Sequence, residues 1–388
     1  ECICVHIGQA GCQVGEKVWE LFCEEHKIGP DGKAADYSAG LIDTDPEREG
    51  DEEHAYESFF NETSGNQFVP RAVFIDTDPA SKDCLRASQF KSLFHPDCMV
   101  TYKRSCMGVF SEGFTMGREY MMVENTMNTI DKAVDLCENL QGFFVMHAVG
   151  GGCGSGLACA LLHEMRARYA KQSIFQPLIY PSQNMANSIV EPYNCLLATH
   201  QIHQEKTCDL TMLMDNEQAY KVAMKNLKIP NPTFCHLNKI IAHARRISGT
   251  TTSLRFPCLL NASLQEVVTN LVPDSRYRYA SVSFAPMRSK KHAQHESLSV
   301  DAIVKELFEE YNAMCDIRET KTNRYLAACI MLRGKELVEN DEGKKVLGPI
   351  QVTRAMKSVT AMRESSASSH RSPVKFLPWV QGGFKVGV

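Results

Sequence analysis

The chain has 388 residues, of which 44% are apolar and 23% are charged. The apolar share is near the globular average and allows substantial cores to form, which excludes wholesale disorder. With 42 Lys and Arg against 46 Asp and Glu, the net charge of −4 argues against a protein that wraps nucleic acid, and the lack of any apolar run near ~20 residues argues against a membrane span.

The first half of the chain alternates between short apolar runs and helical patterns. The apolar runs predict strands at 2–7, 72–76, 98–102, 142–147, 174–180 and 209–214. Apolar residues at helical spacing predict helices at 9–26, 111–137, 154–169 and 188–203. This alternation predicts a parallel sheet with helices on both faces, the doubly wound α/β class.

The second half mixes helices and strands without that regularity. A long helix is predicted over about 232–252, after a proline-rich turn. Further elements are expected: helices near 263–271 and 298–312, and strands near 278–285, 325–332 and 374–380. We therefore predict three parts: the doubly wound domain at 1–213, a connecting region with the long helix at 214–252, and a smaller α+β domain at 253–388.

A glycine cluster is the most informative segment. Five of the seven residues from Gly150 to Gly156 are glycine, and they lie between a predicted strand and a predicted helix. Exposed backbone N–H groups at a helix N-terminus bind anions, which favours a polyphosphate ligand. The alternative is a tight turn without a ligand, but one or two glycines would suffice for that. No Lys-Ser/Thr pair follows, so this is not a Walker A loop.

Further polar and glycine residues follow neighbouring predicted strands. Gly8 and Gly11 form a second strand–helix turn, and Asp76 ends the strand at 72–76. In a parallel sheet these turns reach the edge where ligands bind. Asp78 is either a carboxylate near a magnesium ion or, equally well, the N-cap of the helix that Pro79 begins.

Sixteen cysteines are scattered along the chain without a CxxC pair or a Cys/His zinc spacing. Most of them stand inside apolar runs. We therefore predict reduced, mostly buried cysteines rather than a disulfide framework or a metal site.

Several segments together resemble the tubulin family, and within it the alpha-tubulins. They include ECICVHIGQAGCQVGEKVWELFCEEHKIGPDG at the start, GGGCGSG, MDNEQAY, HESLSV and the final GFKVGV, and they occur in the family's order from end to end. The resemblance implies a GTP-binding domain, a long core helix and a smaller intermediate domain. Alpha-tubulins continue beyond the GFKVG strand into two long helices and an acidic tail, so either this sequence is a part of its protein or the protein lacks that surface.

The resemblance also implies the contacts of GTP or GDP and of Mg²⁺. Asp78 matches the acid near the metal, and Glu191 matches the acid that contacts the ribose. Asn216 and Asn238 match the amides that read the base. The residues carried over as nucleotide-binding are Gly8, Gln9, Ala10, Gln13, Asp76, Cys106, Ala148, Gly151, Gly152, Cys153, Gly154, Ser155, Asn187, Glu191, Asn216, Phe234 and Asn238.

Some of these positions depart from the family pattern. Cys153 stands in place of Thr, Phe234 in place of the Tyr that stacks on the base, and the loop 103–109 has lost a carboxylate and an amide. Each lost hydrogen bond costs about 0.5–1.5 kcal/mol. Because the base-reading pair remains, we still expect bound GTP or GDP.

The resemblance implies that Glu266 is catalytic. In the family, an acid of this loop acts on the GTP of the neighbouring subunit, and a carboxylate can orient or deprotonate water beside a γ-phosphate. Without the resemblance, Glu266 is equally well a surface residue on the first turn of a helix. A second acid of the family loop is Ser263 here.

The expected protein is a divergent alpha-tubulin that forms a heterodimer with beta-tubulin. It is expected to contact lateral tubulin neighbours and microtubule-associated proteins, and to be located in the cytoplasm and cytoskeleton. Its altered pocket suggests a dedicated array such as a cilium or flagellum. The alternative is a tubulin-like protein that caps or decorates the lattice without polymerising. A metabolic enzyme is disfavoured because no Ser-His-Asp or metal spacing emerges.

Overall fold

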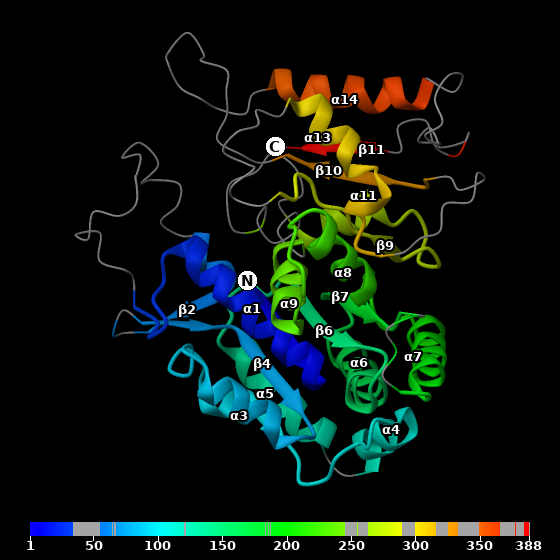
Figure 1. The fold of residues 1–388 in the computed structure, drawn as a ribbon. Helices are drawn as coiled ribbons and strands as arrows, with labels where there is room; N and C mark the ends of the chain where they lie inside the picture. Colours follow the sequence, from blue (N-terminus) through cyan, green and yellow to red (C-terminus); the bar gives the residue numbers. More distant parts are fainter. Residues whose placement is uncertain are drawn as a thin grey trace.

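The computed structural model describes these residues: 1–33, 55–63, 65, 67–119, 122–182, 184, 186, 188–244, 254, 263–288, 299–315, 325–332, 349–364, 377 and 384–387. They form a parallel sheet covered by helices on both faces, followed by a smaller α+β part (Figure 1). The predicted fold class is therefore confirmed.

The main sheet has seven parallel strands in the order β5-β4-β1-β6-β7-β8-β9. Their bounds are β1 Cys2–Ile7, β4 Ala72–Asp76, β5 Met99–Thr101, β6 Gly142–Ala148, β7 Ser173–Tyr180, β8 Leu210–Asp215 and β9 Tyr279–Ser281. In the centre of the sheet, Val5 lies between Val73 and Val145. The carboxyl ends of β4, β1 and β6 are thus neighbours.

Each face of the sheet carries its own helices because side chains alternate along a strand. In β1, Cys2 and Cys4 belong to one core, while Ile3, Val5 and Ile7 belong to the other. The first core includes residues of α1 (Gly8–His26), α3 (Pro79–Ala87), α8 (Asn216–Lys225), α9 (Phe234–Ala244) and α11 (Leu264–Leu271). The second includes residues of α4 (Phe110–Glu119), α5 (Met122–Asp135), α6 (Ala158–Arg168) and α7 (Glu191–Glu205).

The C-terminal part has a small core of its own. Two strands, β10 (Ala328–Met331) and β11 (Phe384–Gly387), pair in parallel. Two helices, α13 (Val300–Leu307) and α14 (Pro349–Glu364), pack against each other above them (Figure 1). Beside the residues that follow α1, β2 (Phe60–Glu62) and β3 (Phe68–Pro70) form an antiparallel pair, and Phe68 N donates to Gly32 O at 2.7 Å.

Some predicted elements differ from the structure. The helix expected at 111–137 is two helices, α4 and α5, and of these α4 contacts the glycine loop at 150–156. Residues 120 and 121 between them lie outside the described residues. A last strand was expected near 374–380, but of this range only Leu377 is described, and it is in no strand. The described strand β11 lies at 384–387 and pairs with β10. Of the long helix, residues 234–244 form α9, while 245–252 lie outside the described residues.

β9 comes from the second half of the chain, yet it pairs with β8 in the main sheet. The main sheet therefore includes a strand from beyond residue 213. The three domain ranges, 1–213, 214–252 and 253–388, remain predictions. None of the described helices is long and apolar enough to cross a membrane. All fifteen cysteines in the described ranges are free, which agrees with the prediction for that part of the chain.

Candidate functional site

Two glycine turns meet where β1 and β6 end. Gly8 has a φ of 74°, a left-handed conformation that glycine adopts without strain. A Cβ atom at Gly8 would lie 3.1 Å from the backbone nitrogen of Gly154. The two turns are therefore in contact at the carboxyl edge of the sheet, as the sequence predicts.

The glycine loop is tightly packed on its inner side. A Cβ would lie 2.6 Å from Val109 N at Gly152, 2.4 Å from Ala148 O at Gly154 and 2.1 Å from Phe110 O at Gly156. A turn alone was expected to need only one or two glycines. That expectation is wrong, because packing requires glycine at these three positions. At Gly151, by contrast, a Cβ would meet nothing within 4 Å, so this residue lies on the open side of the loop.

A turn of π-helix, Cys153–Leu157, leads from the loop into α6. Such turns are rare and are frequent at functional sites. The hydroxyl of Ser155 donates to the carbonyl of Gly151, and the Ser155 N–H donates to the same oxygen at 3.2 Å. This folded helix start offers backbone amides and a positive dipole end to an anion.

We expect alanine at Gly154 to be far more damaging than alanine at Gly151. The Gly154→Ala methyl would overlap a backbone oxygen, and overpacking of this kind costs about 1–3 kcal/mol. Gly151→Ala is the matched control, because its methyl has open space. Urea unfolding of both variants checks this, and equal midpoints would contradict the packing described here.

Two aspartates lie at the carboxyl end of β4, at the same edge: Asp76 ends the strand and Asp78 follows it. Asp76 is 5% exposed, accepts a hydrogen bond from Ser81 Oγ and accepts another from Asp78 N at 3.3 Å. Burial raises the pKa of its carboxyl group, although these hydrogen bonds oppose the effect. Asp78 is exposed and caps α3, accepting from Ala80 N at 2.9 Å. The N-cap interpretation of Asp78 therefore holds.

A magnesium ion would need more than these two side chains. Among the described residues, no group of three His, Cys, Asp or Glu side chains could hold a metal. Mg²⁺ bound with a nucleotide, however, takes one or two carboxylates and completes its shell with phosphates and water. One oxygen of Asp78 accepts the cap hydrogen bond, and this exposed carboxylate fits that pattern.

The loop between β5 and α4 carries Cys106 against the glycine loop. Cys106 is 2% exposed, and its N–H donates to Thr77 Oγ1 at 3.4 Å. A hydrogen bond from Cys153 lowers the pKa of the Cys106 thiol to about 7. The same contact, together with burial, raises the pKa of Cys153. The pocket therefore holds a thiol pair where the family pattern has a hydroxyl.

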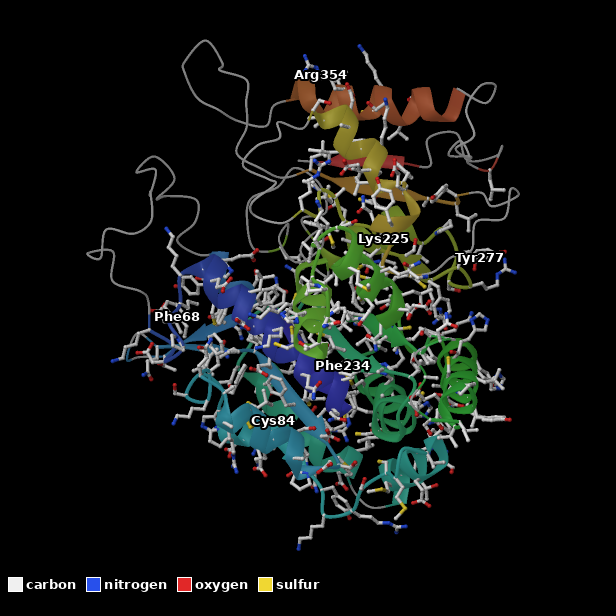
Figure 2. All side chains as sticks on the ribbon, viewed as in Figure 1. Phe68, Cys84, Lys225, Phe234, Tyr277 and Arg354 are labelled. Atoms are coloured by element: carbon white, nitrogen blue, oxygen red, sulfur yellow. The ribbon has the colours of Figure 1, made fainter. Side chains whose placement is uncertain are left out.

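We expect a nucleotide-free sample to show one thiol that ionises near pH 7. The thiolate of Cys106 would absorb at 240 nm. Cys153→Ala removes the hydrogen bond and should move this step upward, towards the ordinary thiol value of 9.0. Replacing the exposed Cys84 (Figure 2) should leave the step in place. A step that survives Cys106→Ser would contradict the assignment.

Asn194 on α7 joins three segments of the site, and the sequence analysis missed it. Its side chain is 2% exposed and donates to Gly108 O at 2.7 Å and to Gly150 O at 2.8 Å. Its oxygen accepts from Phe110 N at 2.9 Å. In the sequence it is a single amide in the helix predicted at 188–203, and the apolar pattern of that helix gave no reason to expect a buried polar residue.

The residues predicted to contact the ribose and the base lie on helices α7, α8 and α9. The side chain of Glu191, at the start of α7, is 3.5 Å from the Cβ position of Gly150. Asn216 begins α8, and Phe234, 56% exposed, begins α9. Helix α9, which also carries Asn238, packs against α1, and Figure 2 places Phe234 at the end of α9 beside α1.

The remaining predicted residues lie on or near the turns. Gln9, Ala10 and Gln13 are on the first turns of α1, and Ala148 ends β6. Gln9 and Gln13 also line a shallow hollow between α1 and α3 that Asp78 borders. Asn187 lies outside the described residues, so its position stays a prediction.

Glu266 lies at the opposite edge of the sheet. It is exposed on the first turn of α11, where Ser263 Oγ caps the helix by accepting from Glu266 N at 3.3 Å. The neighbouring Gln265 accepts from Ser173 Oγ at 3.3 Å, and Ser173 begins β7. The glycine loop follows the other end of the seven-residue β6, roughly 20 Å away at the usual rise per residue. Glu266 therefore cannot act on a ligand held by its own glycine loop.

Large apolar side chains are exposed next to the glycine loop. On and just before α7, the exposed fractions are 89% for Ile189, 67% for Tyr193, 70% for Leu196 and 45% for Leu197. Their spacing puts them on one face of the helix, which we call the apolar α7 face. Met107, 74% exposed, comes from the adjoining loop. Apolar groups of this kind mark interaction surfaces.

Comparison with known proteins agrees with this geometry. The model of the Tubulin/FtsZ family GTPase domain matches residues 1–224, and that of the tubulin C-terminal domain matches residues 275–388. The chain is 38% identical to the tubulin alpha-1 chain of Schizosaccharomyces pombe, 39% to that of Saccharomyces cerevisiae and 38% to that of Arabidopsis thaliana. These alignments cover 100% of this chain and 78%, 79% and 78% of the relatives.

Proposed function

Because the chain belongs to the tubulin family and is a GTP-binding relative of the alpha-tubulins, we propose that it is a subunit of a microtubule. In this proposal it pairs with a beta-tubulin, contacts lateral tubulin neighbours and binds microtubule-associated proteins. Its place is the cytoskeleton, in a dedicated array such as a cilium or flagellum, because its pocket departs from the common pattern.

One observation carries this proposal: the glycine turns and Glu266 lie at opposite edges of one sheet. A protomer built in this way has a nucleotide at one end and a carboxylate at the other. When protomers stack head to tail, the acid of one reaches the nucleotide of the next. The apolar α7 face supports the same arrangement, since it adjoins the glycine loop and a stacked neighbour would cover it.

In the proposed site, backbone amides of the two glycine turns hold the phosphates. Asp78, together with phosphates and water, holds Mg²⁺, which neutralises phosphate charge when bound. In this proposal Glu191 contacts the ribose, and Asn216, Phe234 and Asn238 contact the base. Asp76 and Cys106 line the phosphate end. The chain contributes Glu266 in trans, so any GTPase activity arises only between subunits.

A second candidate is a protein that caps or decorates a lattice without polymerising. The apolar α7 face suits one stable contact as well as a repeated one. In that case, one edge of the sheet would bind tubulin, and Glu266 would have no nucleotide to act on.

The nucleotide and the partner can be tested on one preparation. The protein is purified with whatever beta-tubulin it carries, denatured, and the released nucleotide is identified by chromatography. We expect one guanine nucleotide per chain in addition to that of the partner, and a heterodimer by size. A heterodimer that assembles supports the first candidate, while one that only blocks the growth of other tubulin supports the second. Absence of guanine nucleotide from the purified chain would refute both.

A further inference from the structure

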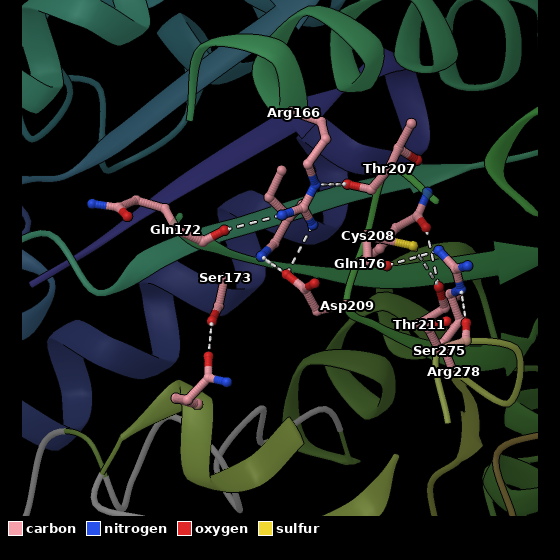
Figure 3. A network of polar contacts seen from close by, with 12 residues as sticks. Arg166, Gln172, Ser173, Gln176, Thr207, Cys208, Asp209, Thr211, Ser275 and Arg278 are labelled. Atoms are coloured by element: carbon pink, nitrogen blue, oxygen red, sulfur yellow. Dashed lines mark hydrogen bonds and ion pairs between the residues drawn. The ribbon is translucent and has the colours of Figure 1, made fainter. Parts of the chain in front are cut away.

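A row of buried polar side chains runs from the glycine loop across three neighbouring strands. His147 on β6, Gln176 on β7 and Thr211 on β8 are each 0% exposed, and Cys208 just before β8 is 3% exposed. Gln176 and Thr211 are directly opposite each other in the register of β7 and β8. Figure 3 shows Gln176, Thr211 and Cys208 in this part of the sheet. We call this row the His147 relay.

The contacts of the relay are short and continuous. His147 Nδ1 contacts the carbonyl oxygen of Gly154, and His147 Nε2 is 2.6 Å from Gln176 Nε2. Thr211 Oγ1 is 3.2 Å from Gln176 Oε1 and 3.1 Å from Cys208 Sγ. The row therefore reaches from the glycine loop to Cys208, just before β8 begins.

The chemistry of the groups determines where each hydrogen lies. A carbonyl can only accept, so His147 Nδ1 must carry the hydrogen that Gly154 accepts. In a neutral imidazole Nε2 is then an acceptor, and it takes a hydrogen from the amide of Gln176. The amide oxygen of Gln176 thus faces Thr211, whose hydroxyl donates to it.

The last link agrees with this direction. Because the Thr211 hydroxyl gives its only hydrogen to Gln176, the thiol of Cys208 must donate to Thr211. Burial raises the pKa of the Cys208 thiol, which keeps it protonated and able to donate. Every group of the relay is therefore used in one consistent direction, and the Thr211 hydroxyl, acting through Gln176, stabilises the tautomer of His147 that the Gly154 carbonyl requires.

The relay ends on the peptide that shapes the glycine loop. The Gly154 carbonyl and the Ser155 N–H belong to one planar peptide group and point in opposite directions. With the carbonyl held towards His147, the Ser155 N–H points to Gly151 O and closes the loop. Gly154 is also the residue that touches the Gly8 turn. A change at His147 would thus alter both phosphate-binding turns.

We propose that His147, held in its Nδ1–H form by Gln176 and Thr211, is a positioning residue for the phosphate-binding loop. This inference rests on nucleotide binding at that loop, as set out under the proposed function. His147 does not touch the ligand; it holds the backbone that does.

The test compares two substitutions at one position. Thr211→Val keeps the shape of the side chain but removes the hydroxyl, so the Gln176 amide can turn and present its oxygen to His147. The hydrogen then moves to Nε2 and the contact with Gly154 is lost. We expect a fluorescent GDP analogue to leave the Thr211→Val heterodimer about five- to tenfold faster. Thr211→Ser, which keeps the hydroxyl, should restore slow release.

A second measurement does not depend on nucleotide. With ¹⁵N-labelled histidine, the wild type and Thr211→Ser should show a slowly exchanging Nδ1–H signal, and Thr211→Val should lose it. A purely structural role would lower the melting temperature without moving the tautomer. Gln176→Leu also cuts the relay but offers His147 Nε2 no acceptor, so the hydrogen should stay on Nδ1 beside the Gly154 carbonyl and the signal should persist.

The outcomes separate the two ideas. Release from Thr211→Val at the wild-type rate would overturn the relay while leaving nucleotide binding intact. A wild-type chain that binds no GDP analogue would overturn the proposed function, and with it the role of His147 in binding. A wild-type spectrum with the hydrogen on Nε2 would overturn the relay in either case.

Discussion

Glu266→Gln is expected to slow GTP hydrolysis in filaments assembled with beta-tubulin by about 10²-fold or more, because a positioned general base typically contributes 10²–10⁴-fold. Assembly itself should persist, since Glu266 is exposed on α11 and Ser263, not Glu266, caps that helix. The nucleotide bound to the variant chain should also be unchanged, because its own glycine loop lies at the other edge of the sheet. Phosphate release and nucleotide content measure the two effects separately.

A matched control for this experiment lies at the same edge of the sheet. Glu138 is exposed just before β6 begins, so Glu138→Gln removes an equal charge from that end of the molecule. It should leave the hydrolysis rate within about twofold. If Glu266→Gln hydrolyses GTP as fast as Glu138→Gln, Glu266 has no role in trans and remains a surface residue of α11.

Asn194→Leu is expected to lower the free energy of unfolding by about 3 kcal/mol. The substitution leaves the carbonyls of Gly108 and Gly150 and the N–H of Phe110 without this partner. Because Gly108 is exposed and Gly150 and Phe110 are half-buried, each of the three lost hydrogen bonds costs about 0.5–1.5 kcal/mol. Since the glycine loop and the 103–109 loop lose their common tether, nucleotide affinity should fall at least tenfold. Urea unfolding and nucleotide titration check the two effects.

The control for Asn194 is Asn128, an exposed amide on α5. Asn128→Leu removes the same chemistry from the surface and should change stability by no more than about 0.5 kcal/mol. Equal losses in both variants would mean that the three contacts of Asn194 contribute little. Loss of stability without weaker nucleotide binding would mean that Asn194 holds the fold but not the ligand loop.

The order of strands and helices could be predicted because local patterns carry it. Strand β4 occupies 72–76 as predicted, and α1 begins one residue before its predicted start. The split of the 111–137 helix could not be predicted, since its apolar period continues on both sides while the close contact with the glycine loop comes from elsewhere in the chain. The position of β11 depends likewise on its distant partner β10.

The sequence by itself determined the doubly wound class, the two glycine turns and the family, because strand alternation, glycine spacing and motifs are properties of contiguous residues. Only the tertiary structure decided which glycines are required by packing, that Asn194 ties three segments together, and that Glu266 and the glycine loop lie at opposite edges of the sheet. These features arise between residues far apart in the chain. The physical reason is that burial and hydrogen-bond geometry are set by strand order and register, which no local pattern contains.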